Sequence, residues 1–301
     1  MKYGKLMGVL TLAGAMLWTT QAGAQLKHLT QDLQVGDTTV LRTMYTPFDP
    51  ENAEETYKVY THVMDFAGET PITKGVGGQF SHHRGLYIGW SRTMLDGEDS
   101  FDTWHMPNSY QEHVEWLHLE MGEGHSTQRQ RIDWNTREDE TLIREVREIT
   151  AHVAPDGMRV IRFASSLEAV AGDIELRGDS HHAGMQIRMS NEVTEHPETT
   201  EYILPEGAER LDNDEVSGGW WAAAGVDVGG KRYWVLHMTP QDHVGGEPLY
   251  SIRPYARFGA FTEPDIAQGE TLEMDFVVII SEQELDQAAC QALYNAYADA
   301  R

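Results

Sequence analysis

Residues 142–170 read LIREVREITAHVAPDGMRVIRFASSLEAV and decide the fold class. Apolar and polar residues alternate with a period of two on both sides of Pro155-Asp156-Gly157. Such alternation is typical of strands with one buried face, and Pro, Asp and Gly suit a tight reversal. The stretch therefore predicts a long antiparallel hairpin with strands over 142–154 and 159–170.

The same alternation recurs along most of the chain, between turns rich in Gly, Pro and Asp. It predicts further strands at 56–64, 86–92, 114–121, 128–134, 185–190, 221–226, 233–238 and 271–280. We expect an all-β fold, an antiparallel β-sandwich of the jelly-roll or supersandwich type. Only 282–300 shows helical spacing, with Ser281 as expected N-cap and Glu284 completing a capping box. This segment predicts one C-terminal amphipathic helix.

The N-terminus has the features of a secretory signal peptide. Lys2 and Lys5 precede an apolar run that ends near Trp18, and Ala22-Gly23-Ala24 is a small-residue cleavage pattern. We expect residues 1–24 to be removed, which leaves 25–301 as a single β-sandwich domain in the periplasm or outside the cell. No later segment is apolar enough to cross a membrane.

The composition limits the partners of the exported chain. The 301 residues carry a formal net charge of −25 at pH 7, and loss of Lys2 and Lys5 makes the mature chain more negative still. Such a chain repels nucleic acid and anionic membranes. The single cysteine, Cys290, allows no internal disulfide. The sequence does not indicate the oligomeric state.

Histidine pairs are the main sign of chemistry. Ser81-His82-His83-Arg84-Gly85 precedes one predicted strand, and His181-His182 precedes another. Imidazole exchanges protons near neutral pH, so we expect both pairs to belong to one site. If each pair were extended, its two side chains would point to opposite faces, and only one would enter a given pocket. A further imidazole, His105, follows the acidic aromatic loop Asp102-Thr103-Trp104.

Arginine and aromatic residues in loops or at strand ends are candidates for ligand binding. Aromatic rings stack on sugar rings, while Arg binds carboxylates and hydroxyls. Burial in the core and pairing with the abundant carboxylates remain alternative roles for these residues. The candidates for substrate binding are Arg84, Arg188, Arg253, Trp104 and Trp221.

Metal and nucleotide cofactors leave no strong pattern. The sequence contains no HExxH motif, no P-loop and no dinucleotide fingerprint, and it lacks the GxSxG elbow of α/β hydrolases. We predict no cofactor. A divalent metal held by His83, His105 and His182 remains an alternative, and Asp99 or Asp102 could add a carboxylate ligand.

Taken in order, several motifs resemble those of the PmoA-like family of secreted bacterial β proteins. They are Ser81-His82-His83-Arg84-Gly85-Leu86 with Gly89-Trp90, Asp102-Thr103-Trp104, Leu142-Ile143-Arg144-Glu145, Met185-Gln186-Ile187-Arg188, Gly219-Trp220-Trp221 and Arg253-Pro254-Tyr255-Ala256-Arg257-Phe258. The resemblance implies a domain of unknown function from a carbohydrate-catabolism context. The family's Asp-His-Pro before the histidine turn is replaced here by Gly78-Gln79-Phe80-Ser81.

These observations favour an exported carbohydrate-active enzyme that cleaves a polysaccharide or oligosaccharide. Elimination at a uronic acid fits best: an arginine, Arg84 or Arg253, neutralises the carboxylate, a histidine removes the C5 proton, and Tyr255 protonates the leaving oxygen. The alternatives are a non-catalytic carbohydrate-binding protein and a His-ligated metal-dependent oxygenase or hydrolase. The candidates for catalysis are His82, His83, His105, His182 and Tyr255.

Overall fold

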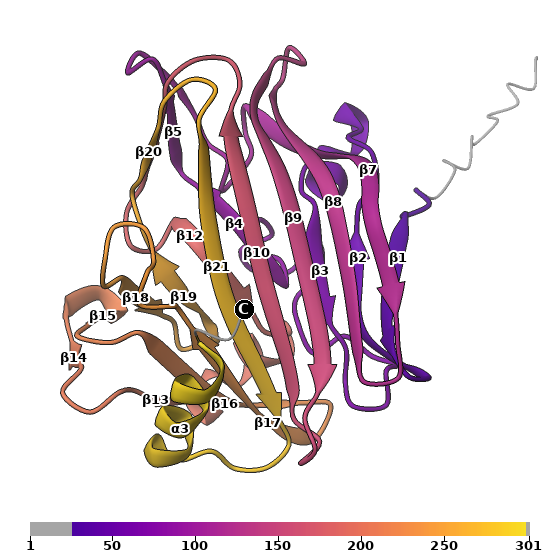
Figure 1. Cartoon of the computed structure of the whole chain (residues 1–301), viewed down its shortest axis with the longest axis vertical. Coiled ribbons are helices and arrows are strands. Elements are labelled where there is room, and N and C mark those ends of the chain that lie inside the picture. The colour runs from indigo at the N-terminus through magenta and orange to yellow at the C-terminus, as the bar shows by residue number, and fades with distance from the viewer. Residues whose placement is uncertain (1–25, 299–301) are drawn as a thin grey trace, which may run out of the picture.

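The computed structural model describes residues 26–298 and consists mainly of antiparallel β-sheet (Figure 1). The first sheet has the strand order β1 (Thr30–Val35), β2 (Thr38–Met44), β3 (Tyr60–Val63), β4 (Leu86–Trp90), β12 (Ala183–Arg188), β19 (Arg257–Phe261), β18 (Leu249–Ile252), β15 (Glu215–Ser217) and β14 (Glu209–Arg210). The second has the order β13 (Glu201–Ile203), β16 (Trp221–Val228), β17 (Lys231–Met238), β21 (Thr271–Ser281), β10 (Arg159–Ala169), β9 (Thr141–Val153), β8 (His125–Thr136) and β7 (Ser109–Met121).

A third, small sheet and several short helices complete the chain. The small sheet has the order β20 (Asp265–Ile266), β11 (Ile174–Arg177), β5 (Arg92–Leu95) and β6 (Asp99–Phe101). The helices are η1 (Pro50–Asn52), α1 (Ala53–Thr56), α2 (Glu192–Glu195), η2 (Pro197–Thr199), η3 (Asp212–Asp214) and α3 (Gln287–Tyr297). All three sheets are open and their strands pair antiparallel, which confirms the predicted all-β antiparallel class.

The two large sheets enclose one apolar core. Leu86, Ile88 and Trp90 of β4 face Trp134 and Phe163 of the second sheet, and all five are fully buried. The rings of Trp90 and Trp134 lie 6.2 Å apart across the core. Because β4 alternates, its remaining residues, Tyr87 and Gly89, lie on the outer face of the first sheet.

The predicted hairpin around Pro155-Asp156-Gly157 is confirmed as β9 and β10. Val153 pairs with Arg159 next to the turn, and the pairing continues to Ile143 and Ala169. Each other predicted strand overlaps an observed one. The predicted strand at 56–64 is shortened to β3, because its first residue, Thr56, ends α1.

The C-terminal helix is present, but its predicted start is wrong. Ser281 ends β21 and its hydroxyl bonds within the following turn, to Gln283. The helix begins at Gln287, and the Asp286 carboxylate accepts a hydrogen bond from the backbone N–H of Ala289. The helix covers the outer face of the second sheet at β16 and β17 (Figure 1).

The predicted signal peptide lies outside the described residues, as do residues 299 and 300 of the predicted helix. Within 26–298, no helix has the length and apolar character that crossing a membrane requires.

The outer face of β4, β12 and β19 is crowded by loops that approach the backbone closely. A Cβ on Gly89 would lie 2.4 Å from the carbonyl oxygen of Thr103, so a larger residue would displace the 102–105 loop. Thr103 fastens this loop, because its backbone N–H donates to the carbonyl of Trp90 at 2.9 Å. Glycine at position 89 therefore lets the loop that carries Trp104 and His105 lie flat on the sheet.

Candidate functional site

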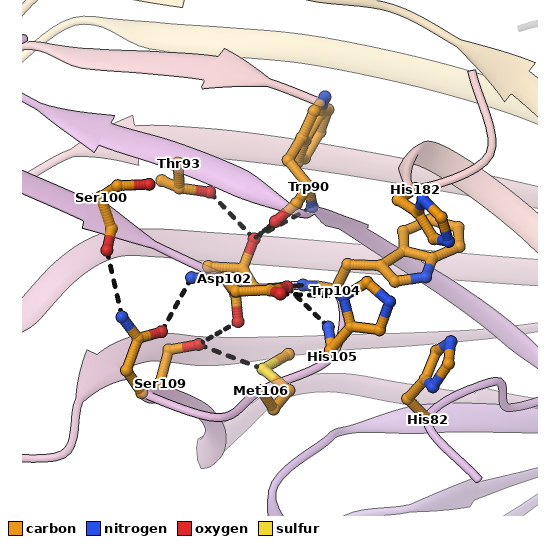
Figure 2. A network of polar contacts seen from close by, with 12 residues as sticks. His82, Trp90, Thr93, Ser100, Asp102, Trp104, His105, Met106, Ser109 and His182 are labelled. Atoms are coloured by element: carbon orange, nitrogen blue, oxygen red, sulfur yellow. Dashed lines mark hydrogen bonds and ion pairs between the residues drawn. The ribbon is translucent and has the colours of Figure 1, made fainter. Parts of the chain in front are cut away.

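A row of imidazoles crosses the outer face of the first sheet. The ring of His82 lies 4.3 Å from that of His83 and 4.3 Å from that of His105. The ring of His105 in turn lies 4.9 Å from that of His182. His82, His105 and His182 come from three separate segments and line up beside Trp104 (Figure 2). The predicted association of the two histidine pairs with His105 is thus present in the structure.

Both members of the first pair join this cluster, contrary to the expectation of opposite faces. His82 and His83 lie in a turn before β4, where strand alternation does not apply. His181 and His182 also precede their strand. The ring of His181 approaches Ser251, with Nδ1 at 2.9 Å from the hydroxyl, while His182 faces His105.

Two of the imidazoles are each held by an aspartate three residues earlier. Nδ1 of His105 lies 2.8 Å from Oδ2 of Asp102, and Nδ1 of His182 lies 2.8 Å from Oδ1 of Asp179. An ionised carboxylate only accepts hydrogen bonds, so each Nδ1 carries the proton and each Nε2 keeps a lone pair. His105 and His182 are about one-third exposed, which leaves both available as proton acceptors.

The carboxylates also organise the turns that bear these histidines. Asp102 accepts hydrogen bonds from the backbone N–H groups of Trp104 at 3.0 Å and His105 at 2.7 Å (Figure 2). Asp179 accepts one from the N–H of His181 at 2.9 Å. The same local geometry therefore occurs twice, on two loops that meet over the sheet.

Beneath the imidazole row lie buried polar atoms without partners. Both ring nitrogens of His83, the hydroxyl of Tyr87 and Nε1 of Trp104 have no hydrogen-bond partner among the described residues. The side chains are at most 2% exposed. Buried polar groups are nearly always satisfied by protein, water or a ligand, so these atoms have hydrogen-bonding capacity left for water or a bound molecule.

Burial and nearby cations keep the first two imidazoles neutral. Burial and the charge of Lys58 lower the pKa of His82 to about 2. Burial and the charge of Arg257 hold the pKa of His83 well below its ordinary value. Burial also lowers the pKa of His182, although its hydrogen bond with Asp179 opposes the effect. His82 and His83 are therefore neutral but weakly basic, which makes His105 and His182 the better candidates for accepting a proton.

Five basic side chains surround these buried polar atoms, which form the floor of the site. All five are at most 4% exposed. Within 26–298, none of them has a carboxylate oxygen within 4.0 Å, although acids outnumber bases 48 to 23 in the whole chain. They are Lys58, Lys74, Arg84, Arg188 and Arg257.

Most of these cations bind loop carbonyls. Nζ of Lys58 donates to the carbonyls of His82 at 3.1 Å and Trp104 at 2.6 Å, which links two site loops. Lys74 donates to the carbonyl of His83 at 3.3 Å. Arg188 donates to the carbonyl of Tyr255. These bonds position the histidine turn, the Trp104 loop and the Tyr255 loop relative to one another.

Strained backbone occurs in each of these loops. Phe80, Met106 and Ala256 have φ values of 55°, 65° and 49°. Residues other than glycine rarely adopt this left-handed region, and such strain concentrates at functional sites. Each strained residue lies within two positions of a site histidine, of Tyr255 or of Arg257.

The structure brings some predicted residues to the cluster and not others. Tyr255 lies 6.2 Å from His83, ring to ring, and Arg188 contacts its ring face. Trp104 is present but fully buried. Trp221 lies in the core under α3, where its Nε1 donates to Gln291 at 3.0 Å.

Two predicted arginines are engaged elsewhere. Arg84 donates to the carbonyls of His83 at 3.1 Å and Glu54 at 2.8 Å. Arg253 forms an ion pair of 3.1 Å with Asp214. The guanidinium groups of both arginines are therefore already engaged by oxygen atoms of the protein.

Sequence reasoning missed Arg257, Asp179 and Tyr87 as members of the site. One signal was available: Asp102-Thr103-Trp104-His105 and Asp179-Ser180-His181-His182 share the spacing Asp-x-x-His. This repeat predicts two aspartate-held imidazoles.

No group of three His, Cys, Asp or Glu side chains in the described part of the chain is arranged to hold a metal ion. The alternative set His83, His105 and His182 thus does not form a preassembled metal site. Nδ1 of the last two is already bound to an aspartate.

Comparison with known proteins identifies the family. Residues 30–295 match the profile described as a family of unknown function (DUF6807). The chain belongs to this family. The match agrees with the expected domain of unknown function and does not confirm the PmoA-like name. A search of curated proteins found no match.

Two solved structures show a distant likeness to this DUF6807 member. A chain described as a kojibiose phosphorylase from human microbiome is 10% identical with a TM-score of 0.37, and the match covers 86% of this chain and 31% of that one. The protein thus spans about a third of the length of that phosphorylase. A GalM/aldose epimerase homologue from C. elegans is 10% identical with a TM-score of 0.36, covering 85% of this chain and 99% of that one. Similarity at this level does not indicate a shared function.

Proposed function

We propose that this protein is an exported carbohydrate-active enzyme that cleaves a uronic acid-containing chain by β-elimination. The observation that carries the proposal is the pair of imidazoles of His105 and His182. Each is oriented by an aspartate, and the two face each other at 4.9 Å beside a buried cationic floor. Acid–base chemistry next to cations is what elimination at a uronate requires.

The reaction needs a base, an acid and a positive charge. Nε2 of His105 or His182 takes the proton from C5 of the uronate, and the electron pair forms the C4–C5 double bond. The C4–O bond breaks, and the leaving oxygen takes a proton from Tyr255. A buried cation stabilises the negative charge that develops on the carboxylate. No water or cofactor is consumed.

Hydrolysis fits this arrangement less well. Glycoside hydrolases generally use two carboxyl groups on either side of the scissile bond. The carboxylates next to the imidazole row, Asp102 and Asp179, are bound to His105 and His182. Their role in the geometry is to orient bases.

A purely binding role is also less favoured. It predicted Trp104 and Trp221 as platforms for sugar rings, yet both side chains are buried. The aromatic groups that reach the surface of the site are Phe80, which is 37% exposed, and the half-buried Tyr255, with ring centres 4.9 Å apart.

The experiment is to measure absorbance near 235 nm while the mature protein acts on a panel of uronate and neutral polysaccharides, with and without EDTA. We expect a rise on a uronate polymer only, unchanged by EDTA. His105→Ala and His182→Ala should each lower the rate, by about 10²-fold to 10⁴-fold for the residue that is the base. His196→Ala, a surface histidine 67% exposed, is the matched control. A flat trace on every uronate polymer would refute the elimination.

A further inference from the structure

We propose that Arg257 is the centre of an enclosed subsite for the anionic group of the substrate, a sugar carboxylate. This inference rests on the proposed function in one respect, because it takes the anion to be part of a sugar. It replaces Arg84 and Arg253, which the sequence favoured for this role.

Arg257 differs from the neighbouring cations in what it binds. Its Nη1 donates to two neutral side-chain oxygens, Oε1 of Gln186 at 3.2 Å and the hydroxyl of Ser251 at 3.1 Å. Its Nε is buried and has no partner within 26–298. The guanidinium lies 5.9 Å from the ring of Trp104. Arg257 therefore combines a positive charge with an unused donor at the floor of the site.

Unused donors from other elements gather around the same point. They come from His83, Tyr87, Trp104 and His181, each at most 5% exposed and each with at least one polar side-chain atom that no described residue contacts. Hydroxyl, indole and imidazole N–H groups can all donate to an ionised carboxylate, which only accepts. Arg257 supplies the charge-assisted hydrogen bond.

The charge distribution also points to an anion. A buried cation without a counter-charge is costly, and here three arginines and two lysines lie together without an acid within 4.0 Å among the described residues. Burial holds the pKa of Lys58 well below its ordinary value, so the three arginines supply the permanent positive charge. Two acids beside the imidazole row, Asp102 and Asp179, are engaged with imidazoles at the rim. Burial, with the charges of Arg84 and Arg188, lowers the pKa of Lys74 to about 7. A bound carboxylate would offset the mutual repulsion of these groups.

The test uses calorimetric titration of the mature protein at constant ionic strength. The probes are D-glucuronate, D-glucose as its neutral counterpart, and sodium sulfate as a free oxyanion. We expect glucuronate to bind at least about tenfold more tightly than glucose. Arg257→Gln should remove this preference and Arg257→Lys should keep part of it. Arg42→Gln is the matched control, because Arg42 lies in the same sheet but pairs with Asp32 at 2.6 Å.

A second variant tests the subsite independently if Arg257→Gln fails to fold. Tyr87→Phe removes only a buried hydroxyl that has no partner within 26–298. It should leave Tm unchanged or higher and weaken glucuronate binding severalfold.

The outcomes separate this subsite from the reaction. Equal binding of glucuronate and glucose, or an undiminished preference in both folded Arg257→Gln and Tyr87→Phe, would overturn the subsite. Sulfate binding as tight as glucuronate would also overturn it, since the site would then serve a free oxyanion. If Arg257→Gln loses the preference for glucuronate and the unsubstituted protein eliminates no polymer, the subsite is supported and the reaction is refuted. Undiminished elimination by Arg257→Gln refutes the subsite alone.

Discussion

At the scale of single residues, the site depends on which nitrogen of each histidine carries a proton. Asp102 and Asp179 fix this for His105 and His182 by binding Nδ1 at 2.8 Å. A carboxylate in this position also stabilises the imidazolium that forms when the base takes a proton. The aspartates therefore act as positioning residues.

Replacing these aspartates should reveal which histidine is the base. In Asp102→Asn and Asp179→Asn, the amide oxygen can still accept from the backbone N–H groups, so the turns should persist. The negative charge is lost, and we expect kcat on a uronate polymer to fall about 10²-fold for the aspartate that holds the base. The pKa of the general base, which sets the acidic limb of the pH–rate profile, should fall by about one unit, since the imidazolium loses its counter-charge. A purely structural role would instead lower Tm and leave the pH profile unchanged.

At the scale of elements, the β9–β10 hairpin carries a buried ion pair into the core. Glu145 and Arg147 are both fully buried, and their side chains form two hydrogen bonds of 2.8 Å. Trp134 and Ser165 also donate to Glu145, and Arg147 donates to the carbonyl of Val59 at 2.9 Å. This network joins the hairpin to the first sheet through the segment before β3.

Arg147→Met should destabilise the fold strongly, because it leaves Glu145 charged and unpaired between the sheets. We expect the free energy of unfolding in urea to fall by about 3–5 kcal/mol. The control is Arg144→Met in the same strand. The Arg144 side chain is 39% exposed, so its ion pairs with Asp133 and Glu168 should contribute under about 1 kcal/mol each. The double change Glu145→Leu with Arg147→Met should recover much of the loss. Similar small losses for both single variants would contradict this account.

The hairpin also shows what sequence can predict. Its strands alternate over many residues because one face is buried, so periodicity and turn chemistry were sufficient. Short strands such as β5, β11 and β20 are held by pairing between distant segments, and their few residues carry no clear period. The helix start failed for a similar reason: Ser281 continues the ladder of β21, which outweighs its preference for an N-cap.

The candidate site, too, could be predicted from the sequence only in part. Clustered histidines are visible in the sequence, so their meeting was predicted. Arg253 and Arg257 each keep a buried Nε without a partner among the described residues, but of the two only Arg253 pairs with a carboxylate, that of Asp214, which lies 39 residues away along the chain. Such a distinction is made by tertiary contacts, and local pattern does not contain it.

At the scale of the whole molecule, charge is separated between surface and site. The chain has a formal net charge of −25, yet five basic side chains, three of them arginines, are buried together under the imidazole row. Acids outnumber bases over the whole chain, but the local positive charge gives an anionic ligand a reason to bind in spite of the net charge. The same burial that keeps imidazoles neutral also links the stability of the fold to pH.

Three histidines outside the proposed catalytic set make that link testable. Burial lowers the pKa of His62 to about 4, of His237 to about 3 and of His243 to about 4. In the unfolded chain each would titrate near 6.5. Between these values the unfolded chain binds protons that the folded protein does not, so stability falls as pH decreases from about 6.5 to about 4. Above pH 6.5 these groups are neutral in both states and contribute no pH dependence.

Each such histidine should therefore steepen the loss of stability by about 1.4 kcal/mol per pH unit within this window. Urea unfolding of the mature protein at pH 7.5, 6.5, 5.5 and 4.5 measures the slope. His62→Gln can keep the hydrogen bond that His62 makes to Thr73 at 3.1 Å while removing the titrating group, so its slope should be smaller by one histidine. His196→Gln, on the surface, should retain the full slope. Equal slopes in His62→Gln and His196→Gln would show that His62 protonates as readily in the folded protein as in the unfolded chain, and its burial would then have no part in acid denaturation.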